Sequence, residues 1–202
     1  DVAEAKPRYI WIDAAANFPD YANSKENIAK DMEKIKAAGF TDIIVDVRPT
    51  TGDVLFNTNV VDQVKRMDVW GNSGYSYYER TETWDYLQAF IEEARIQGLK
   101  VNASINTFVG GYLCPYNLGH DGVLFRDESK KGWASVANLA DGLTNTMDLL
   151  DDETDYGAKF FNPANDDVQN FVLQLLADLA KYDLDGIILD RCRYDDYGLE
   201  SD

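Results

Sequence analysis

Charged side chains gather directly after a short apolar run near the carboxyl end of the sequence. The run Gly186–Leu189 leads into Asp190, Arg191 and Arg193. A run of this length predicts a strand buried on both faces of a parallel sheet, and ligands bind at the carboxyl ends of such strands. Asp190 is therefore predicted to be a catalytic carboxylate, acting as acid, base or nucleophile. The alternative is that Asp190 only organises the strand ends through an ion pair with Arg48 or Arg193.

Three earlier apolar runs also end in a polar residue. These runs and the residues that follow them are Arg8–Ile12 with Asp13, Ile43–Val45 with Asp46, and Val101–Ile105 with Asn106. Right-handed crossovers would align the ends of all four strands at one edge of a sheet. We expect Asp13, Asp46 and Asn106 to bind substrate there. The alternatives are that Asp13 caps the following loop and that Asn106 forms a turn.

Arg48 stands two residues after Asp46, and residues two apart on a strand point the same way. If both point inward, the guanidinium would bind a substrate carboxylate or hydroxyl groups and would lower the pKa of a neighbouring aspartate. The alternative is a fixed ion pair that holds this strand to its neighbours. Arg193, which follows the last strand, is a further predicted substrate-binding residue.

Helical patterns separate the four runs and predict the elements that position them. Apolar residues recur at helical spacing after the segment Asn23–Asn27, after Thr83 and after Asn165 or Asp166, each of which offers a cap for a helix. Strands that alternate with helices of this length indicate parallel βα units. The first strand is not followed by G-x-G-x-x-G, which argues against a dinucleotide-binding domain, and we expect no cofactor. Spacing alone leaves an open sheet and a barrel as alternatives.

Two long connections, residues 50–83 and 109–161, follow the second and third strands. Connections of this length within one domain are usually functional, and both contain several aromatic residues, including Trp70 and Tyr112. We expect these two rings to stack on the faces of sugar rings. The alternative is that such aromatic residues pin the connections to the sheet as a satellite core.

Composition excludes several classes of partner. With 36 acidic and 19 basic residues among 202, the chain carries a net charge of −17, which repels nucleic acid and anionic lipid. No apolar stretch approaches the ~20 residues of a membrane span. We expect no metal, because His120 is the only histidine and the acidic run Asp148–Asp155 lacks the register of a calcium-binding loop. Cys114 and Cys192 leave a disulfide and two free thiols as alternatives.

Four segments resemble successive motifs of the glycosyl-hydrolase-like family 10, in the family's order. They are Val45–Pro49 (VDVRP), Val101–Asn106 (VNASIN), Phe161–Val168 (FNPANDDV) and Asp185–Tyr194 (DGIILDRCRY). The last segment is similar to the family signature D-G-I-x-x-D-R-x-R-Y-P, with Asp195 in place of the final proline. We therefore expect the loop after this strand to take a different course from the family's.

The resemblance implies a (β/α)8 barrel in a secreted or envelope-anchored bacterial protein, with a lipid anchor in its precursor. The family's activity would be cleavage of glycan strands, including peptidoglycan stripped of its peptides. A barrel of this type usually needs ~250 residues, and this chain ends shortly after its fourth predicted strand. We expect residues 1–202 to form the amino-terminal half of one barrel domain. Either a missing half or a second copy would cover the edge strands.

Glycoside hydrolysis usually requires two carboxyl groups. Asp190 matches the family's position for one of them, and we expect the second to come from the missing strands, so that this chain alone would be inactive. Two other functions remain as alternatives. One is a non-catalytic carbohydrate-binding domain. The other is a metal-dependent hydrolase, which is disfavoured because neighbouring arginines compete with a cation for the carboxylates.

Overall fold

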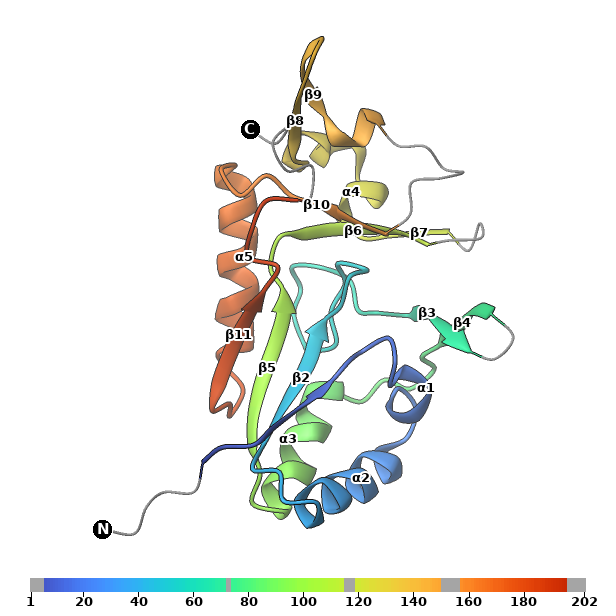
Figure 1. Cartoon of the computed structure of the whole chain (residues 1–202), viewed down its shortest axis with the longest axis vertical. Helices are drawn as coiled ribbons and strands as arrows, with labels where there is room; N and C mark the ends of the chain where they lie inside the picture. Colours follow the sequence, from blue (N-terminus) through green and yellow to red (C-terminus); the bar gives the residue numbers. More distant parts are fainter. Residues whose placement is uncertain (1–5, 72–73, 115–118, 150–156, 196–202) are drawn as a thin grey trace.

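A four-stranded parallel sheet forms the centre of the molecule. The computed structural model describes residues 6–71, 74–114, 119–149 and 157–195. The sheet has the order β1 (Tyr9–Ile12), β2 (Asp42–Arg48), β5 (Lys100–Asn106) and β11 (Gly186–Asp190), and every neighbouring pair is parallel. The prediction of four parallel strands is thereby confirmed. Their carboxyl ends point toward the upper part of the molecule in Figure 1.

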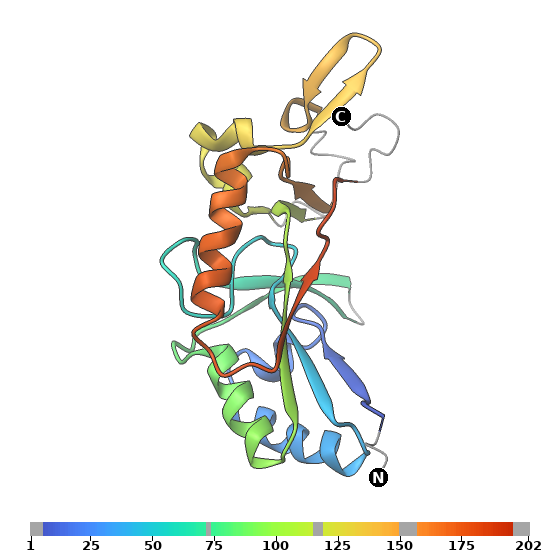
Figure 2. The same cartoon turned by 90° about the vertical axis from the view of Figure 1, so that its left-hand side faces the viewer.

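Helices connect these strands and lie to one side of the sheet (Figure 2). They are α1 (Phe18–Tyr21), α2 (Lys25–Ala37), α3 (Tyr86–Ile96) and α5 (Asp166–Leu179). Ser24 caps α2 and Asn165 caps α5, each accepting hydrogen bonds from backbone N–H groups of the first turn. The cap of α3 is Asp85, whereas the sequence predicted Thr83, which lies too far from the first turn to accept such a bond. No helix in the described ranges is long and apolar enough to cross a membrane.

The core lies between the sheet and these helices. The central strands contribute side chains that are fully or almost fully buried, Ile43, Val45, Val101 and Ala103. The helices contribute Ile28, Met32, Leu87, Phe90 and Leu175. Burying one large apolar side chain contributes about 1.5–3 kcal/mol. The apolar runs of the central strands and the helical recurrence of apolar residues between them are therefore what hold the strand ends in place.

The outer strands of the sheet are more exposed than its centre. Ile187 and Leu189 on β11 are 37% and 45% exposed. The prediction that this strand is buried on both faces was wrong, because β11 has a partner strand on one side only within the described residues. Tyr9 and Trp11 on β1, at the other edge, are also exposed. The described strands form an open sheet and do not close a barrel.

The two long connections contain secondary structure of their own, whereas the sequence predicted loops. In the first, β3 (Arg66–Gly71) and β4 (Gly74–Glu79) pair in antiparallel fashion. The second holds a three-stranded sheet of β6 (Val109–Cys114), β7 (Gly119–Asp121) and β10 (Gly157–Phe160). Between β7 and β10 in sequence lie α4 (Val123–Arg126), β8 (Val136–Leu139), β9 (Gly142–Asn145) and two 3-10 helices, Glu128–Trp133 and Thr146–Leu149. Figures 1 and 2 show that the elements of the second connection lie beyond the carboxyl ends of the parallel strands, whereas the β3–β4 pair lies beside their upper part.

Gly122 allows the second connection to pack closely on the first. Its φ of +93° belongs to the left-handed region that favours glycine. A Cβ atom there would lie 2.5 Å from the carbonyl oxygen of Thr51 and 2.5 Å from Cα of Gly111. A side chain at this position would therefore push α4 and β7 away from the segment that follows β2.

Candidate active site at the strand ends

The polar residues that end the four parallel strands meet around one cavity. Asp13, Asp46, Asn106 and Asp190 line a cavity of about 120 Å³. The other lining residues are Trp11, Ala15, Pro49, Thr50 and Arg191. The parallel order of the strands brings segments that are far apart in sequence to this edge, as the sequence predicted. What these residues do there chemically stays a prediction.

Asp46 is the most buried carboxyl group of this cavity, at 8% exposed. Its Oδ1 atom has neither solvent contact nor a hydrogen-bond partner in the described part of the chain. Burial raises the pKa of Asp46 from 3.8 to about 7, and the nearby charges of Asp13 and Asp190 also raise it. Hydrogen bonds from the backbone N–H groups of Ala14 and Arg48 act in the opposite direction. A carboxyl group with this pKa can release or take up a proton near neutral pH.

Asp190 lies at the exposed mouth of the cavity, at the end of β11. Its Oδ1 accepts a hydrogen bond from the N–H of Arg191 (2.8 Å), and its carbonyl oxygen accepts one from the N–H of Thr107 (2.8 Å). Arg191 has a φ of 44°, which is strained for a residue with a Cβ atom and costs about 1–2 kcal/mol. The turn after β11 therefore holds the carboxylate of Asp190 at the mouth at some cost in stability.

Arg48 does not reach this cavity. A bulge interrupts the pairing of β2 with β5 between Asp46 and Arg48, so their side chains do not share a face as predicted. The guanidinium of Arg48 is buried and donates hydrogen bonds to the carbonyl oxygens of Asn106, Thr107 (3.4 Å) and Val109 (2.5 Å). It ties the end of β5 to the start of β6. The predictions that Arg48 binds substrate or pairs with an aspartate at the strand ends were therefore wrong.

The surroundings of Arg48 explain why a buried cation is tolerated. The rings of Phe161 and Phe171 lie 6.0 and 5.7 Å from the guanidinium, where the faces of aromatic rings attract a cation. Burial lowers the pKa of Arg48 to about 10, while the charges of Asp53 and Asp46 favour its protonated form. The side chain remains charged at neutral pH. The positive charge of Arg48 in turn favours the ionised form of Asp46, but burial of the carboxyl group has the larger effect, so the pKa of Asp46 is raised and not lowered as expected.

Asp13 and Asn106 line the cavity and also hold the local backbone. Oδ1 of Asp13 accepts a hydrogen bond from the N–H of Ala16 (2.7 Å), and Nδ2 of Asn106 donates to the carbonyl oxygen of Arg48 (2.8 Å). The bond at Asp13 is the loop-capping role that the sequence offered as an alternative, whereas the side chain of Asn106 joins the end of β5 to β2, which differs from the turn offered for it. Oδ2 of Asp13 and Oδ1 of Asn106 are each suited to accept a hydrogen bond from a sugar hydroxyl.

Three other predicted substrate-binding residues are absent from the lining of this cavity. The guanidinium of Arg193 lies 5.1 Å from the ring of Phe160. The hydroxyl of Tyr112 donates to Asp68 (3.1 Å) and so joins β6 to β3. Trp70 is 66% exposed and packs edge-on against its cross-strand neighbour on β4. The structure therefore does not bring these side chains to Asp190 as predicted.

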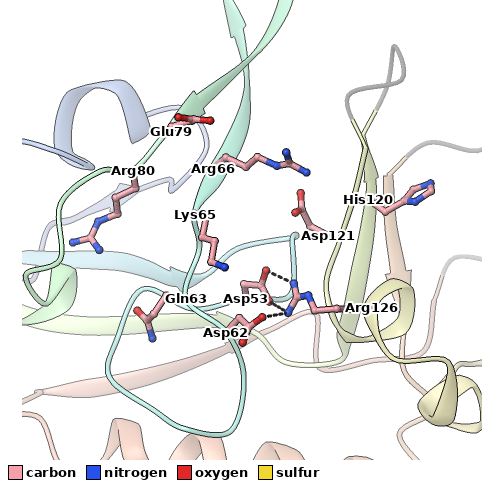
Figure 3. Close-up of a pocket in the computed structure, with 10 residues that line it drawn as sticks. All are labelled: Asp53, Asp62, Gln63, Lys65, Arg66, Glu79, Arg80, His120, Asp121 and Arg126. Carbon is pink, nitrogen blue, oxygen red and sulfur yellow. Dashed lines mark hydrogen bonds and ion pairs between the residues drawn. The ribbon is translucent and has the colours of Figure 1, made fainter.

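A second and larger cavity, of about 510 Å³, lies between the β3–β4 pair, β7 and α4 (Figure 3). Its lining residues are Asp53, Asp62, Gln63, Lys65, Arg66, Glu79, Arg80, His120, Asp121 and Arg126. Sequence reasoning missed it, because these residues come from several segments that no local pattern relates. It missed Trp11 at the first cavity too, although Trp11 stands two residues before Asp13 and so shares its face of β1.

Within the described residues, no group of three or more histidine, cysteine, aspartate and glutamate side chains is arranged to hold a metal ion. The ring of His120 stacks on Phe125 at 4.6 Å. Cys192 is an exposed free thiol, and the side chain of Cys114 lies outside the described part of the chain. Asp148 forms an ion pair with Lys131, whereas residues 150–155 of the acidic run are not among the described residues.

Comparison with known proteins extends what the geometry shows. No family model matches the chain, so membership in the glycosyl-hydrolase-like family 10 stays a prediction. An S-layer-related protein of Niallia circulans is 30% identical over 195 residues, which are 92% of this chain but 11% of that protein. The chain thus spans a small part of the relative that it matches.

Several solved structures are similar to this chain. Alpha-L-fucosidase isoenzyme 2 from Paenibacillus thiaminolyticus matches with a TM-score of 0.57 at 20% identity, over 92% of this chain and 23% of that enzyme. A hypothetical protein from Ruminiclostridium thermocellum matches with a TM-score of 0.53 at 12% identity, over 94% of this chain and 78% of that protein. A variant of the GH36 alpha-galactosidase AgaA from Geobacillus stearothermophilus matches with a TM-score of 0.50 at 12% identity, over 90% of this chain and 20% of that enzyme. The chain therefore has a mixed α/β fold that also occurs in glycoside hydrolases.

Proposed function

We propose that the cavity at the strand ends cleaves glycosidic bonds in a glycan strand, with Asp190 and Asp46 as its two carboxyl groups. The observation that carries this proposal is the meeting of three carboxyl groups, of which one, Asp46, has a pKa of about 7. Glycoside hydrolysis needs one carboxyl group that holds a proton and one that is ionised. The shared fold of the fucosidase and galactosidase is consistent with this chemistry.

The environments of the two carboxyl groups suggest how they divide the work. Asp46, buried among like charges, would hold the proton that the leaving glycosidic oxygen needs. Asp190, exposed at the mouth, would attack the sugar or activate a water. Asp13 keeps the pKa of Asp46 high through its charge. The second carboxyl group thus lies within this chain in the proposal, whereas the sequence led us to expect it in absent strands.

The proposal extends to the setting of the domain. The unpartnered sides of β1 and β11 within the described residues, together with exposed Tyr9 and Trp11, support a sheet that is half of a (β/α)8 barrel. Further strands of a longer natural polypeptide, or a second copy, would pair with these edges. The S-layer-related relative supports a place in the bacterial cell envelope. The substrate in this proposal is a wall glycan, such as peptidoglycan stripped of its peptides.

A non-catalytic carbohydrate-binding domain is the second candidate function. It is favoured by the inaccessibility of Oδ1 of Asp46, because a proton donor must reach the substrate, and by the small volume of the cavity, about 120 Å³. In that case the carboxyl groups would only accept hydrogen bonds from sugar hydroxyls.

Release of reducing ends from a panel of bacterial and plant glycans tests the proposal. The assay compares the 202-residue chain with a longer natural polypeptide that contains it, and we expect release by the longer form. Asp190→Asn should lower release about 100- to 10,000-fold while leaving glycan binding intact. Asp141→Asn, the same change at an exposed turn residue, is the matched control and should retain full activity.

Three outcomes would contradict the proposed mechanism. Equal turnover by Asp190→Asn would remove the role of Asp190. Binding without release by every form would favour the carbohydrate-binding alternative. Loss of release on addition of EDTA would favour a metal-dependent hydrolase.

A further inference from the structure

The larger cavity is separate from the strand-end cavity, because the two share no lining residue. Its volume of about 510 Å³ lies within the range typical of small-molecule sites, about 300–1,000 Å³. Every residue that lines it is polar or charged. Such a lining does not suit an apolar ligand and suits one that offers hydrogen-bonding groups over most of its surface.

One wall of the cavity is fixed by an ion-pair cluster. Both Nη atoms of Arg126 donate to the carboxylate of Asp53, at 3.1 and 2.7 Å, and one also contacts Asp62 at 2.9 Å. Asp53 is 5% exposed, so this fork is set in place by the fold and not by solvent. The wall therefore presents preorganised groups, whose positions a ligand would not need to change.

The opposite wall presents two cations, Lys65 and Arg66, and the positive charge of Arg66 favours the ionised form of Asp121 in the same cavity. In the described part of the chain, no hydrogen bond or ion pair joins the side chain of Lys65 or Arg66 to a carboxylate; Arg66 lies over the ring of Tyr77 at 4.4 Å. Figure 3 shows the charged ends of Lys65, Arg66 and Asp121 turned toward the space above the Asp53–Arg126 pair. Two cations and a carboxylate thus face the same space.

The overall charge makes this arrangement informative. The chain carries a net charge of −17, yet basic and acidic side chains are equal in number around this cavity. A negatively charged ligand would be repelled by most of the surface and accepted here. The stacked guanidinium of Arg66 is suited to a carboxylate, because its planar fork matches the two carboxylate oxygens.

We propose that this cavity binds an acidic sugar residue, a pyranose ring that carries a carboxylate. The sugar carboxylate contacts Arg66 and Lys65, and its ring hydroxyls donate to Asp121 and Asp62. The hydroxyl groups of the sugar account for the carboxylates beside the cations, because they can donate hydrogen bonds to these carboxylates. A simple anion would gain nothing from the carboxylates. The inference does not depend on cleavage at Asp190, because the cavity could hold an acidic unit of any glycan.

Titration calorimetry with digalacturonate tests this inference against two comparison ligands. The first is the matched neutral galactose disaccharide, and the second is inorganic phosphate. We expect digalacturonate to bind at least 10-fold more tightly than either. The double variant Lys65→Gln with Arg66→Gln should weaken binding at least 10-fold. Asp190→Asn should bind as tightly as the unmodified chain, which separates this site from the proposed active site.

A charge-matched control removes the general effect of net charge. Lys30→Gln with Lys36→Gln changes two exposed lysines of α2 by the same total charge and should leave the affinity unchanged. Equal loss in this control would overturn the inference, as would equal binding of the neutral disaccharide. Equal binding of phosphate would reduce the site to one for a simple anion. If the double variant Lys65→Gln with Arg66→Gln does not fold, amide chemical shifts of the unmodified chain provide the test. Digalacturonate should then change the shifts of β3 and β7, and changes confined to other elements would overturn the inference.

Discussion

Two buried aspartates, Asp46 and Asp53, stand at the two cavities and differ in one respect. They are 8% and 5% exposed, and burial raises the pKa of both. Asp53 receives a two-point hydrogen bond from Arg126, which opposes the effect of burial. Asp46 has no such cation, and its neighbours Asp13 and Asp190 raise its pKa further. The hydrogen-bonded guanidinium of Arg126 therefore distinguishes Asp53 from Asp46.

This difference indicates which of the two carboxyl groups can exchange a proton. A buried carboxylate with a guanidinium partner is a fixed part of a wall, whereas one among like charges holds a proton that it can release near neutral pH. Arg48 lies between the two aspartates in sequence but donates to carbonyl oxygens. In the described part of the chain no hydrogen bond or ion pair joins the Arg48 guanidinium to the carboxyl group of Asp46, and burial keeps the pKa of that group raised.

Replacing Arg48 should have the largest effect on the free energy of unfolding. Arg48→Met would leave the carbonyl oxygens of Asn106 and Val109 without their buried donor, and we expect a loss of about 3–5 kcal/mol in the free energy of unfolding. Urea denaturation measures this. Arg8→Met, at an exposed arginine, is the control and should change the value by less than about 0.5 kcal/mol. A similar small change for both would show that Arg48 does not hold the strand ends.

Asp46→Asn should stabilise the protein at high pH. The pKa of Asp46 is about 7 when folded and 3.8 ordinarily, so the folded state binds more protons between these values and stability falls as pH rises through them. The variant has no such penalty, and we expect it to be more stable than the unmodified chain by about 2–4 kcal/mol at pH 8. The gain should shrink toward zero near pH 4. A gain that does not vary with pH would contradict a raised pKa.

The same pKa makes a prediction for catalysis. If Asp46 donates the proton, release of reducing ends should decrease as pH rises above about 7, because the carboxyl group ionises. Initial rates between pH 5 and 9 measure this, with Asp141→Asn as the control that keeps the same profile. A rate that is flat above pH 7 would assign the proton donor to another group.

Arg126→Gln should have a smaller effect, at the other aspartate. It removes the cation that offsets the burial of Asp53, and because Arg126 is itself 41% exposed, we expect a loss of about 2 kcal/mol in the free energy of unfolding at pH 7. The loss should be smaller at pH 4, where Asp53 without its partner can be protonated. Equal losses at both pH values would show that packing, and not charge, sets the cost.

Trp70→Ala should change stability least. The ring is 66% exposed and its main contact is the edge-on packing with Tyr75 at 4.8 Å, so we expect a change of less than about 1 kcal/mol. Thermal unfolding measures it. A larger loss would show that the hairpin surface contributes as much to the fold as the buried aspartates do.

Much of the framework was predictable from local patterns. The cap of α2 lies in the predicted segment Asn23–Asn27 and Asn165 caps α5, because caps and apolar periodicity depend on residues close in sequence. Three of the four strands end at or next to the predicted polar residue, whereas β2 continues past Asp46 to Arg48. Even there, local signals were ambiguous: Asp85, not Thr83, caps α3. The exposure of β11 was not predictable, because a short apolar run looks the same at the centre and at the edge of a sheet.

The sequence by itself determined that four strands alternate with helices and that Asp13, Asp46, Asn106 and Asp190 lie at or near their carboxyl ends. Only the tertiary structure decided that a bulge turns Arg48 away from Asp46, and that Arg66, Asp121 and Arg126 surround one cavity. The physical reason is the separation in sequence over which each effect acts. Periodicity and capping act over a few residues, whereas the burial that raises a pKa and the packing that closes a cavity depend on segments separated by most of the chain.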